Sequence, residues 1–461
     1  MKRRDFLHKA GLLSALPIAS ASLIAATPSA PNKKQKAKNI IFMVSDGMST
    51  GTLTMAHLFR KKTERKNSAW IDLYLQGKVT RGIMETSSAD SMVTDSAAAS
   101  SAWGGGMKVN NNSLNVGPNG QKPDPIWQKF KAAGKSAGCV TTVPITHATP
   151  AGFLINTPSR KNQELIAELY LEQEFDVLMG GGNQYFAAQS RADQKDLITN
   201  FRDRGYQVAS TKQELNEASG EKILGLFAED ALPYAIDRSH QSHYQNCPSL
   251  LEMTHKAIER LSKNEQGFVL QIEAGKVDWA AHGNDLPGLI YDQIEFDKCI
   301  ESVCSFAEKD GETLVIITTD HGNSNPGLLY GAKSDEGFLQ LKSYKSSNAE
   351  ILSTINKDTS PSTLIQKFKD QQNWECSPKL AEALLDQYGS LSEADIRNYR
   401  NLPFFKLSAH QEKLHHVGWI GNEHSADFVE LCAFGPGSEK IQAFQRNIEL
   451  YELMLEAAGL I

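Results

Sequence analysis

The sequence predicts an α/β protein with a large, mainly parallel central sheet, helices on both faces, and a mostly helical insertion. Short apolar runs of strand length alternate with amphipathic stretches of helical period along most of the chain. Alternation of this kind favours a parallel sheet that is covered by helices on both sides. The long stretch between His321 and His424 has little strand signal, and the insertion is expected over about residues 325–415.

The expected strands share apolar, often β-branched residues and are bounded by polar residues or glycine: residues 40–45, 138–143, 176–179, 268–272, 314–318 and 428–434. Helices are expected over 163–173 and 250–263, where apolar residues recur at helical spacing. Within the insertion, residues 357–374 and 378–402 are polar and favour helices. An alanine-rich segment after Asp95 favours a further helix that begins at Ser96.

The N-terminal segment resembles an export signal of the twin-arginine type. Arg3 and Arg4 precede an apolar run over residues 10–26, which is too short and too weakly apolar for a stable membrane span. Residues 1–30 are therefore predicted to be the signal, and residues 31–461 the mature domain. This predicts a periplasmic or secreted protein with no membrane span after the signal is removed.

Composition excludes several classes of function. The 461 residues are 40% hydrophobic and 22% charged, which is ordinary for a globular protein. A formal net charge of −6 gives no sign of the basic surface that nucleic acid binding requires. The six cysteines form no CxxC pair, so a zinc ribbon or a thioredoxin-like site is not indicated. Cys139 and Cys432 lie in strand-like runs and are expected to be buried free thiols, with few disulfides or none elsewhere.

Carboxylates and histidines follow several of the expected strands. Asp46 ends the first strand, Glu273 ends another, and Asp320 with His321 ends a third, while His424 precedes the last. In an open α/β sheet, sites form outside the carboxyl ends of the strands. Asp278 and His282 are four residues apart, so on a helix they share one face and suit two ligands of one ion. Ser96 is expected at the start of a helix, where a serine nucleophile and the negatively charged adduct that it forms are favoured. Each of these patterns alone is also typical of helix caps, turns and ion pairs.

Taken together, these motifs resemble the alkaline phosphatase family. The resemblance covers nearly the whole mature chain in the same order: Asp46-Gly47, Thr94-Asp95-Ser96, Thr146-His147-Ala148-Thr149-Pro150, Ser159-Arg160, Glu273 with Asp278 and His282, Asp320-His321, and His424. It implies an alkaline phosphatase-like fold and hydrolysis of phosphate monoesters to an alcohol and inorganic phosphate through a phosphoserine intermediate. Small-molecule phosphate monoesters are the implied partners, and a homodimer is left open.

The resemblance also implies the role of each residue. Two zinc ions are implied, one held by Asp278, His282 and His424, and the other by Asp46, Asp320, His321 and the nucleophile Ser96. Glu273 and Thr149 would join Asp46 around one magnesium ion. Arg160 would bind two phosphate oxygens beside Ser96, and Asp95, His147 and Trp279 would lie around these groups without binding substrate.

Two positions depart from one common pattern of the family, and two other functions stay open. His147 stands where many members have an aspartate, and its imidazole is a poorer partner for a hard cation such as magnesium. Trp279 stands where some members have a lysine. The alternatives are a phosphodiesterase of the same superfamily and a non-catalytic metal- or phosphate-binding protein. A sulfatase is disfavoured, because the residues after Ser96 lack the Cys/Ser-x-Pro-x-Arg pattern.

Overall fold

A computed structural model describes residues 36–461 except 357, 393–394 and 397–398. The predicted export signal lies outside the described residues, so it stays a prediction. None of the helices in the described part of the chain combines the length and the apolar character that crossing a membrane requires.

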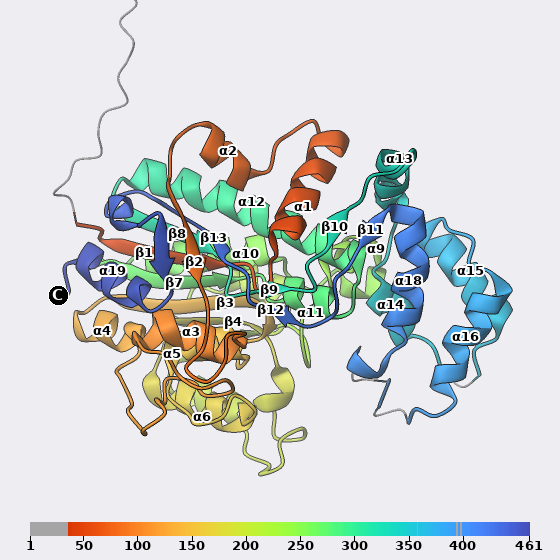
Figure 1. The fold of residues 1–461 in the computed structure, drawn as a ribbon. Helices are drawn as coiled ribbons and strands as arrows, with labels where there is room; N and C mark the ends of the chain where they lie inside the picture. Colours follow the sequence, from red (N-terminus) through yellow and green to blue (C-terminus); the bar gives the residue numbers. More distant parts are fainter. Residues whose placement is uncertain (1–35, 357, 393–394, 397–398) are drawn as a thin grey trace, which may run out of the picture.

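The core of the molecule is a ten-stranded sheet (Figure 1). Seven of the nine pairings between neighbouring strands are parallel, and β13 pairs antiparallel with both of its neighbours. The predicted fold class is therefore confirmed. In order across the sheet the strands are β14 (Phe444–Arg446), β2 (Thr80–Glu85), β13 (Val429–Phe434), β8 (Thr313–Thr318), β1 (Asn39–Val44), β7 (Phe268–Glu273), β3 (Ser136–Pro144), β4 (Val177–Gly181), β6 (Lys222–Leu226) and β5 (Tyr206–Ala209).

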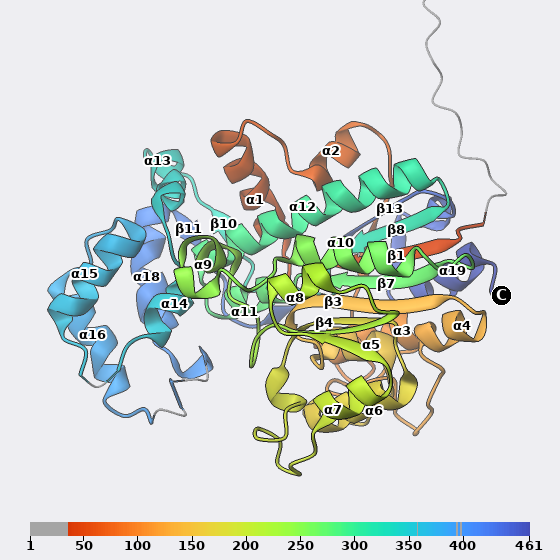
Figure 2. The same cartoon turned by 180° about the vertical axis from the view of Figure 1, so that it is seen from behind.

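Helices cover both faces of the sheet, as Figures 1 and 2 show from opposite sides. The central strand β1 is buried throughout and sends alternate side chains to the two faces: Ile41 and Met43 enter one core, and Phe42 enters the other. The first core is covered by α1 (Thr50–Thr63), α2 (Ala69–Leu75), α8 (Lys212–Glu217), α9 (Ala235–His240), α10 (Leu250–Leu261), α11 (Lys276–His282) and α12 (Leu286–Asp310). The second is covered by α3 (Ser96–Gly105), α4 (Ile126–Ala132), α5 (Ala148–Leu154), α6 (Gln163–Gln173), α7 (Leu197–Asp203) and α19 (Glu449–Ala458).

The chain between β8 and β13 is mostly helical and has a hydrophobic core of its own, to which Leu364, Phe368, Leu384 and Leu407 belong. In Figure 1 these helices lie to one side of the sheet. They are α13 (Ser334–Leu339), α14 (Asn348–Ser353), α15 (Pro361–Gln372), α16 (Pro378–Tyr388) and α18 (Phe404–His415). Two short antiparallel pairs connect this part to the sheet: β9 (Gly322–Asn323) with β12 (His424–Ser425), and β10 (Gly327–Leu328) with β11 (Val417–Gly418).

All six cysteines are free thiols in the structure, and Cys139 and Cys432 are buried, as expected. The sequence missed the strands β2, β5, β6 and β14, all of which lie at or next to an edge of the sheet. Their apolar patterns are weak; in β2, for example, the apolar Ile83 is exposed, and only Met84 is buried.

Candidate active site

The carboxyl ends of the adjacent strands β1, β7 and β8 bring four ionisable side chains together in the middle of the sheet. Asp46 follows β1, Glu273 ends β7, and Asp320 with His321 follows β8. All four are 0% exposed. The convergence expected from the strand order is therefore observed.

The first possible metal group consists of Asp278, His282 and His424, whose ligand atoms lie within 4.8 Å of one another. Asp278 and His282 share one face of α11, as their spacing predicted. The Nε2 atoms of His282 and His424 lie 3.4 and 3.6 Å from the carboxylate oxygens of Asp278. Their Nδ1 atoms donate to the backbone oxygens of Asn422 at 2.7 Å and Thr94 at 2.9 Å. These bonds place the protons on Nδ1, so both Nε2 lone pairs face Asp278, as metal ligands would.

The second group consists of Asp46, Asp320 and His321. The Nε2 atom of His321 lies 3.0 Å from Asp320 Oδ2 and 3.8 Å from Asp46 Oδ1, and its Nδ1 lies 3.2 Å from the backbone oxygen of Gly322. Gly47, with φ +66°, donates its N–H to Asp320 Oδ1 at 2.9 Å. A Cβ atom on Gly47 would stand 2.5 Å from Asp278 Oδ1, so the close approach of the first and second groups requires glycine here.

The third group consists of Asp46, Glu273 and His147. Thr149 Oγ1 lies 3.1 Å from Asp46 Oδ2, and Thr141 donates its hydroxyl to Glu273 Oε2. His147 Nε2 lies 3.0 Å from Nη2 of Arg160 and accepts a hydrogen bond from it, because a guanidinium can only donate. Burial, together with the charge of Arg160, lowers the pKa of His147 to about 3, so the imidazole is neutral.

Several buried carboxylate oxygens in these groups lack a hydrogen-bond donor among the described residues. They are Asp46 Oδ1, Glu273 Oε1 and Asp320 Oδ2. Burial and the neighbouring carboxylates raise the pKa of Asp46, and burial raises the pKa of Glu273 to about 7. Burial alone would also raise the pKa of Asp278, but the imidazoles around it lower that pKa below its ordinary value. Buried carboxylates with unpaired oxygens need positive charge, so the residues fit divalent cations bound among them.

Ser96 lies at the edge of this arrangement, at the start of α3. Asp95 is the N-cap, and its Oδ1 accepts from Ala98 N at 2.9 Å, so the predicted helix start is confirmed. Ser96 is 1% exposed, and its Oγ lies 3.3 Å from His321 Nε2. The hydroxyl therefore lies beside the second group and at a helix N-terminus, where an anion is favoured.

Arg160 and Ser96 both line a cleft of about 520 Å³. Its Nη1 donates to Asp95 Oδ2 at 3.0 Å. Trp279 also lines the cleft, and its ring meets His147 edge-on with centroids 6.1 Å apart. The residues predicted for the site thus lie around one cleft and the three groups at its floor.

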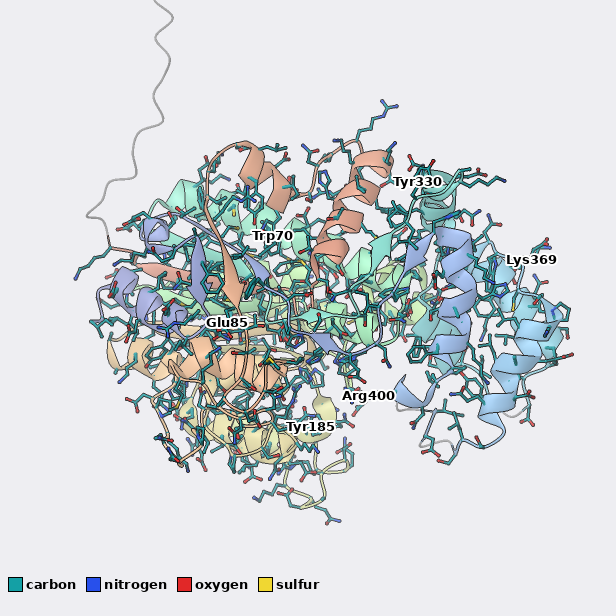
Figure 3. All side chains as sticks on the ribbon, in the orientation of Figure 1. Trp70, Glu85, Tyr185, Tyr330, Lys369 and Arg400 are labelled. Atoms are coloured by element: carbon teal, nitrogen blue, oxygen red, sulfur yellow. The ribbon has the colours of Figure 1, made fainter. Side chains whose placement is uncertain are left out.

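Sequence reasoning missed several residues of the cleft: Asn111, Asn112, Lys161, Gln163, Arg400 and Glu423. Arg400, labelled in Figure 3, comes from the helical insertion and lies where that part approaches the sheet. Four of these residues lie in loops, Gln163 begins α6 and Arg400 lies in a short 3-10 helix, and their spacing in the sequence is irregular. No pattern in the sequence could have joined them to the site.

The model of the alkaline phosphatase family matches residues 37–460, which is nearly the whole described chain. The chain belongs to the alkaline phosphatase family. It is 31% identical to alkaline phosphatase 4 of Bacillus subtilis over 459 residues, which cover 94% of each protein. It is also 31% identical to alkaline phosphatase of Escherichia coli over 367 residues, which cover 68% of this chain and 78% of the relative.

Solved structures agree with this assignment. The crystal structure of Thermus thermophilus alkaline phosphatase superposes with a TM-score of 0.86 at 31% identity and covers 94% of this chain and 93% of its own. The cold-active alkaline phosphatase of a psychrophilic Shewanella gives a TM-score of 0.76 at 27% identity and covers 91% and 100%. This protein is therefore a hydrolase of the phosphatase class.

Proposed function

We propose that this phosphatase hydrolyses phosphate monoesters through a phosphoserine on Ser96, in a site that holds two zinc ions and one magnesium ion. The observation that carries the proposal is the place of Ser96 Oγ, 3.3 Å from His321 Nε2 and beside three groups of buried carboxylates and imidazoles. A nucleophile, a cationic clamp and potential metal ligands thus share one cleft.

The donor atoms fit the proposed ions. Asp278, His282 and His424 would hold one zinc ion, because carboxylate oxygen and imidazole nitrogen suit zinc. Asp46, Asp320 and His321 would hold the second zinc ion, with Ser96 next to it. When bound, zinc supplies positive charge that favours ionised serine and the departing alcohol oxygen.

Asp46, Glu273 and Thr149 would hold the magnesium ion, since hard cations prefer oxygen ligands. A crystal structure of a histidine-to-aspartate variant of the TAB5 alkaline phosphatase, which shares the fold at 23% identity, has Mg bound in its M3 site. His147 belongs to the third group of this chain, but its contact with Arg160 makes it a neighbour of the ion rather than a ligand.

The proposed reaction consists of two displacements at phosphorus, in which Ser96 and Arg160 take part. Ser96 Oγ bonds to phosphorus as its proton leaves, and the alcohol oxygen departs on the opposite side with the electron pair of the broken P–O bond and takes up a proton. Water next attacks the phosphoserine, the Ser96 Oγ–P bond breaks, and Ser96 recovers a proton as phosphate leaves. Arg160 offers a planar fork for two nonbridging oxygens throughout both steps.

A phosphate monoester fits this cleft better than a diester. Arg160 is already fixed by Asp95 at 3.0 Å, so its guanidinium is held for nonbridging oxygens that carry negative charge. A monoester has one such oxygen more than a diester. This favours the monoesterase over the phosphodiesterase alternative.

Export and assembly remain proposals from the sequence. The paired arginines before an apolar run support export, by the twin-arginine route, to the periplasm or the medium. The division into a signal over 1–30 and a catalytic domain over 31–461, with an insertion over about 325–415, is proposed on the same basis. A homodimer is also left open.

The test of the mechanism is Ser96→Ala with Ser100→Ala as the matched control. Ser100 lies one turn further along α3, and its hydroxyl donates to backbone oxygens away from the cleft. In the metal-loaded enzyme, Ser96→Ala should abolish the acid-stable phosphoenzyme and lower kcat by about 10³-fold or more, as loss of a nucleophile does. Ser100→Ala should retain both. A phosphoenzyme trapped on another residue, or full activity of Ser96→Ala, would overturn the proposal.

A further inference from the structure

A second, smaller cavity of about 220 Å³ adjoins the catalytic cleft. The two cavities share His282, Arg400 and Glu423. The smaller one is completed on the side of the insertion by Leu402, Phe404 and Phe405. Its wall therefore combines a proposed metal ligand with apolar side chains of the helical insertion.

The geometry of the proposed reaction leads toward this cavity. In an in-line displacement the alcohol oxygen leaves on the side of phosphorus opposite to Ser96 Oγ. Ser96 lies beside His321, at 3.3 Å, so the alcohol oxygen would lie toward the group of Asp278, His282 and His424. His282 borders both cavities, so the organic part of the ester would continue past His282 into the smaller one.

The lining of the smaller cavity favours an aromatic group. Phe404 is 7% exposed and is fixed against Gly283, where a Cβ atom would stand 3.1 Å from its ring. Phe405 is 56% exposed, so much of its ring is left for a ligand to cover. Arg400 adds a planar guanidinium, which can stack on an aromatic ring. The lining combines the apolar Leu402, Phe404 and Phe405 with the polar His282, Arg400, Asn422 and Glu423. The three apolar side chains are where the organic part of a ligand would pack.

We propose that this cavity receives the alcohol part of the substrate and that Phe405 gives the enzyme a preference for monoesters of aromatic alcohols. The inference rests on the proposed monoesterase function and adds the substrate class. Glu423 and Arg400 line both cavities and carry opposite charges. The cavity therefore favours an apolar ring on the alcohol over a charged group.

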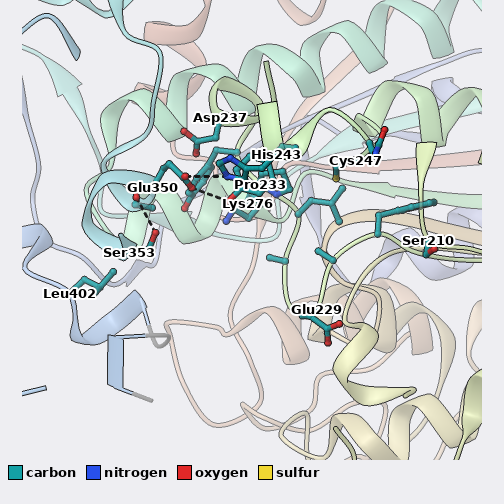
Figure 4. A pocket seen from close by; sticks show the side chains of 18 of the residues that line it. Ser210, Glu229, Pro233, Asp237, His243, Cys247, Lys276, Glu350, Ser353 and Leu402 are labelled. Atoms are coloured by element: carbon teal, nitrogen blue, oxygen red, sulfur yellow. Dashed lines mark hydrogen bonds and ion pairs between the residues drawn. The ribbon is translucent and has the colours of Figure 1, made fainter. Parts of the chain in front are cut away.

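A larger cavity of about 550 Å³, shown in Figure 4, is the main rival for this role. It reaches Leu402 but does not touch His282 or His424. Two of its carboxylates already have hydrogen-bond donors: Glu350 accepts from Tyr244 at 2.9 Å, and Asp237 accepts from Ser347 at 2.6 Å. The larger cavity shares no lining residue with the catalytic cleft, whereas the smaller cavity shares three. The smaller cavity is therefore the one that continues from the cleft.

The experiment compares phenyl phosphate with glycerol 2-phosphate in the metal-loaded wild type, Phe405→Ala and Phe405→Tyr. Phe405→Ala should lower kcat/KM for phenyl phosphate by about tenfold, mainly through KM, because the lost contact binds ground state and transition state alike. The value for glycerol 2-phosphate should stay within about twofold. Phe405→Tyr keeps the ring and should restore the preference.

Phe428→Ala is the matched control, since Phe428 is 57% exposed and lines neither cavity. It should leave both substrates unchanged. Equal losses on the two substrates in Phe405→Ala, or the same change in Phe428→Ala, would overturn the inference while the wild type remained an active monoesterase. A wild type inactive on both monoesters would instead overturn the proposed function.

Discussion

Arg160 Nη1 lies 3.0 Å from Asp95 Oδ2, and Asp95 is also the N-cap of the helix that begins at Ser96. The same carboxylate therefore fixes the guanidinium and the start of the helix that carries the proposed nucleophile. Its Oδ1 binds Ala98 N at 2.9 Å, and its Oδ2 also accepts from Asn112 N at 3.0 Å. Asp95 thus sets the distance between the guanidinium of Arg160 and Ser96.

Replacing Arg160 by alanine should weaken monoester turnover and inhibition by phosphate much more than diester turnover. A monoester dianion gives the guanidinium more nonbridging charge to bind than a diester does. The expected loss on the monoester is on the order of 2–4 kcal/mol, as for removal of one charged partner in the transition state. The measurement is kcat/KM for an aryl phosphate and its methyl diester.

Lys161→Ala provides the control for this variant, because the neighbouring lysine also lines the cleft but is exposed. It should lower kcat/KM far less than Arg160→Ala. Losses of equal size on both esters in Arg160→Ala would mean that the arginine supports the fold or the metal groups, and the monoesterase proposal would lose its main support.

Asp95→Ala and Asp95→Asn separate the two roles of Asp95. Alanine removes the cap and should lower the free energy of unfolding by about 1 kcal/mol. Asparagine keeps an oxygen for Ala98 N, so stability should be retained, but Arg160 loses its ionic partner and kcat/KM should fall. Urea unfolding and monoester kinetics check both expectations. The backbone oxygen of Asn112 accepts from Arg160 N at 2.8 Å, and His147 accepts from its guanidinium. Wild-type activity in Asp95→Asn would show that these two contacts suffice to hold the arginine.

The sequence predicted the central sheet because its strands are buried on both faces and read as continuous apolar runs. It also placed Asp46, Glu273 and Asp320 correctly, because each follows such a strand and parallel strands end at one edge. The helix start at Ser96 followed from the alanine-rich segment after the cap. These are local patterns that the observed fold preserves.

What the sequence missed depends on contacts between distant segments. The position of Arg400 in the cleft is set by the packing of the insertion against α1 and α12, and nothing near it in the sequence marks it. The contact of His147 with Arg160 joins a strand end to a loop, so its effect on the third group could not be read from His147 alone. The edge strands β5 and β14 are only four and three residues long, and β14 buries the polar Gln445 while Phe444 is exposed, so neither shows the apolar alternation that predicts strands.

Removal of metal ions should abolish activity and lower the melting temperature together. The three groups gather several buried carboxylates, which repel one another when no cation balances them. Zinc should restore most of the rate after chelation, and magnesium should add to it. The check is activity and thermal unfolding before and after exhaustive chelation; full activity after chelation would contradict the metal proposal.

The metal-free protein should lose stability as pH rises from about 4.5 to 7. Burial raises the pKa of Glu273 from 4.5 to about 7 in the folded chain. The folded state therefore binds this proton more tightly than the unfolded state. The contribution of Glu273 to the free energy of unfolding is complete below pH 4.5 and is lost as pH rises through 7. The expected change is on the order of 3 kcal/mol.

Glu273→Gln isolates this contribution, because glutamine does not titrate while other groups still do. The difference in pH dependence between the chelated wild type and the chelated variant gives the part that belongs to Glu273. Identical profiles for the two proteins would show that the carboxyl group titrates normally. Bound metal should reverse the trend in the wild type, since a cation favours the ionised carboxylate.

His147→Asp should tighten magnesium binding at the third group. His147 Nε2 accepts from Arg160 at 3.0 Å, so the neutral ring carries its proton on Nδ1 and cannot donate that lone pair to a cation. An aspartate adds a hard, anionic oxygen beside Asp46 and Glu273, and affinity for such cations rises with the number of carboxylate ligands, here on the order of tenfold. Magnesium titration of the zinc-loaded protein measures the change.

His147→Asn, neutral and of the same size as the aspartate, is the control and should not gain affinity. Equal magnesium affinity in the two variants would place the ion away from this position.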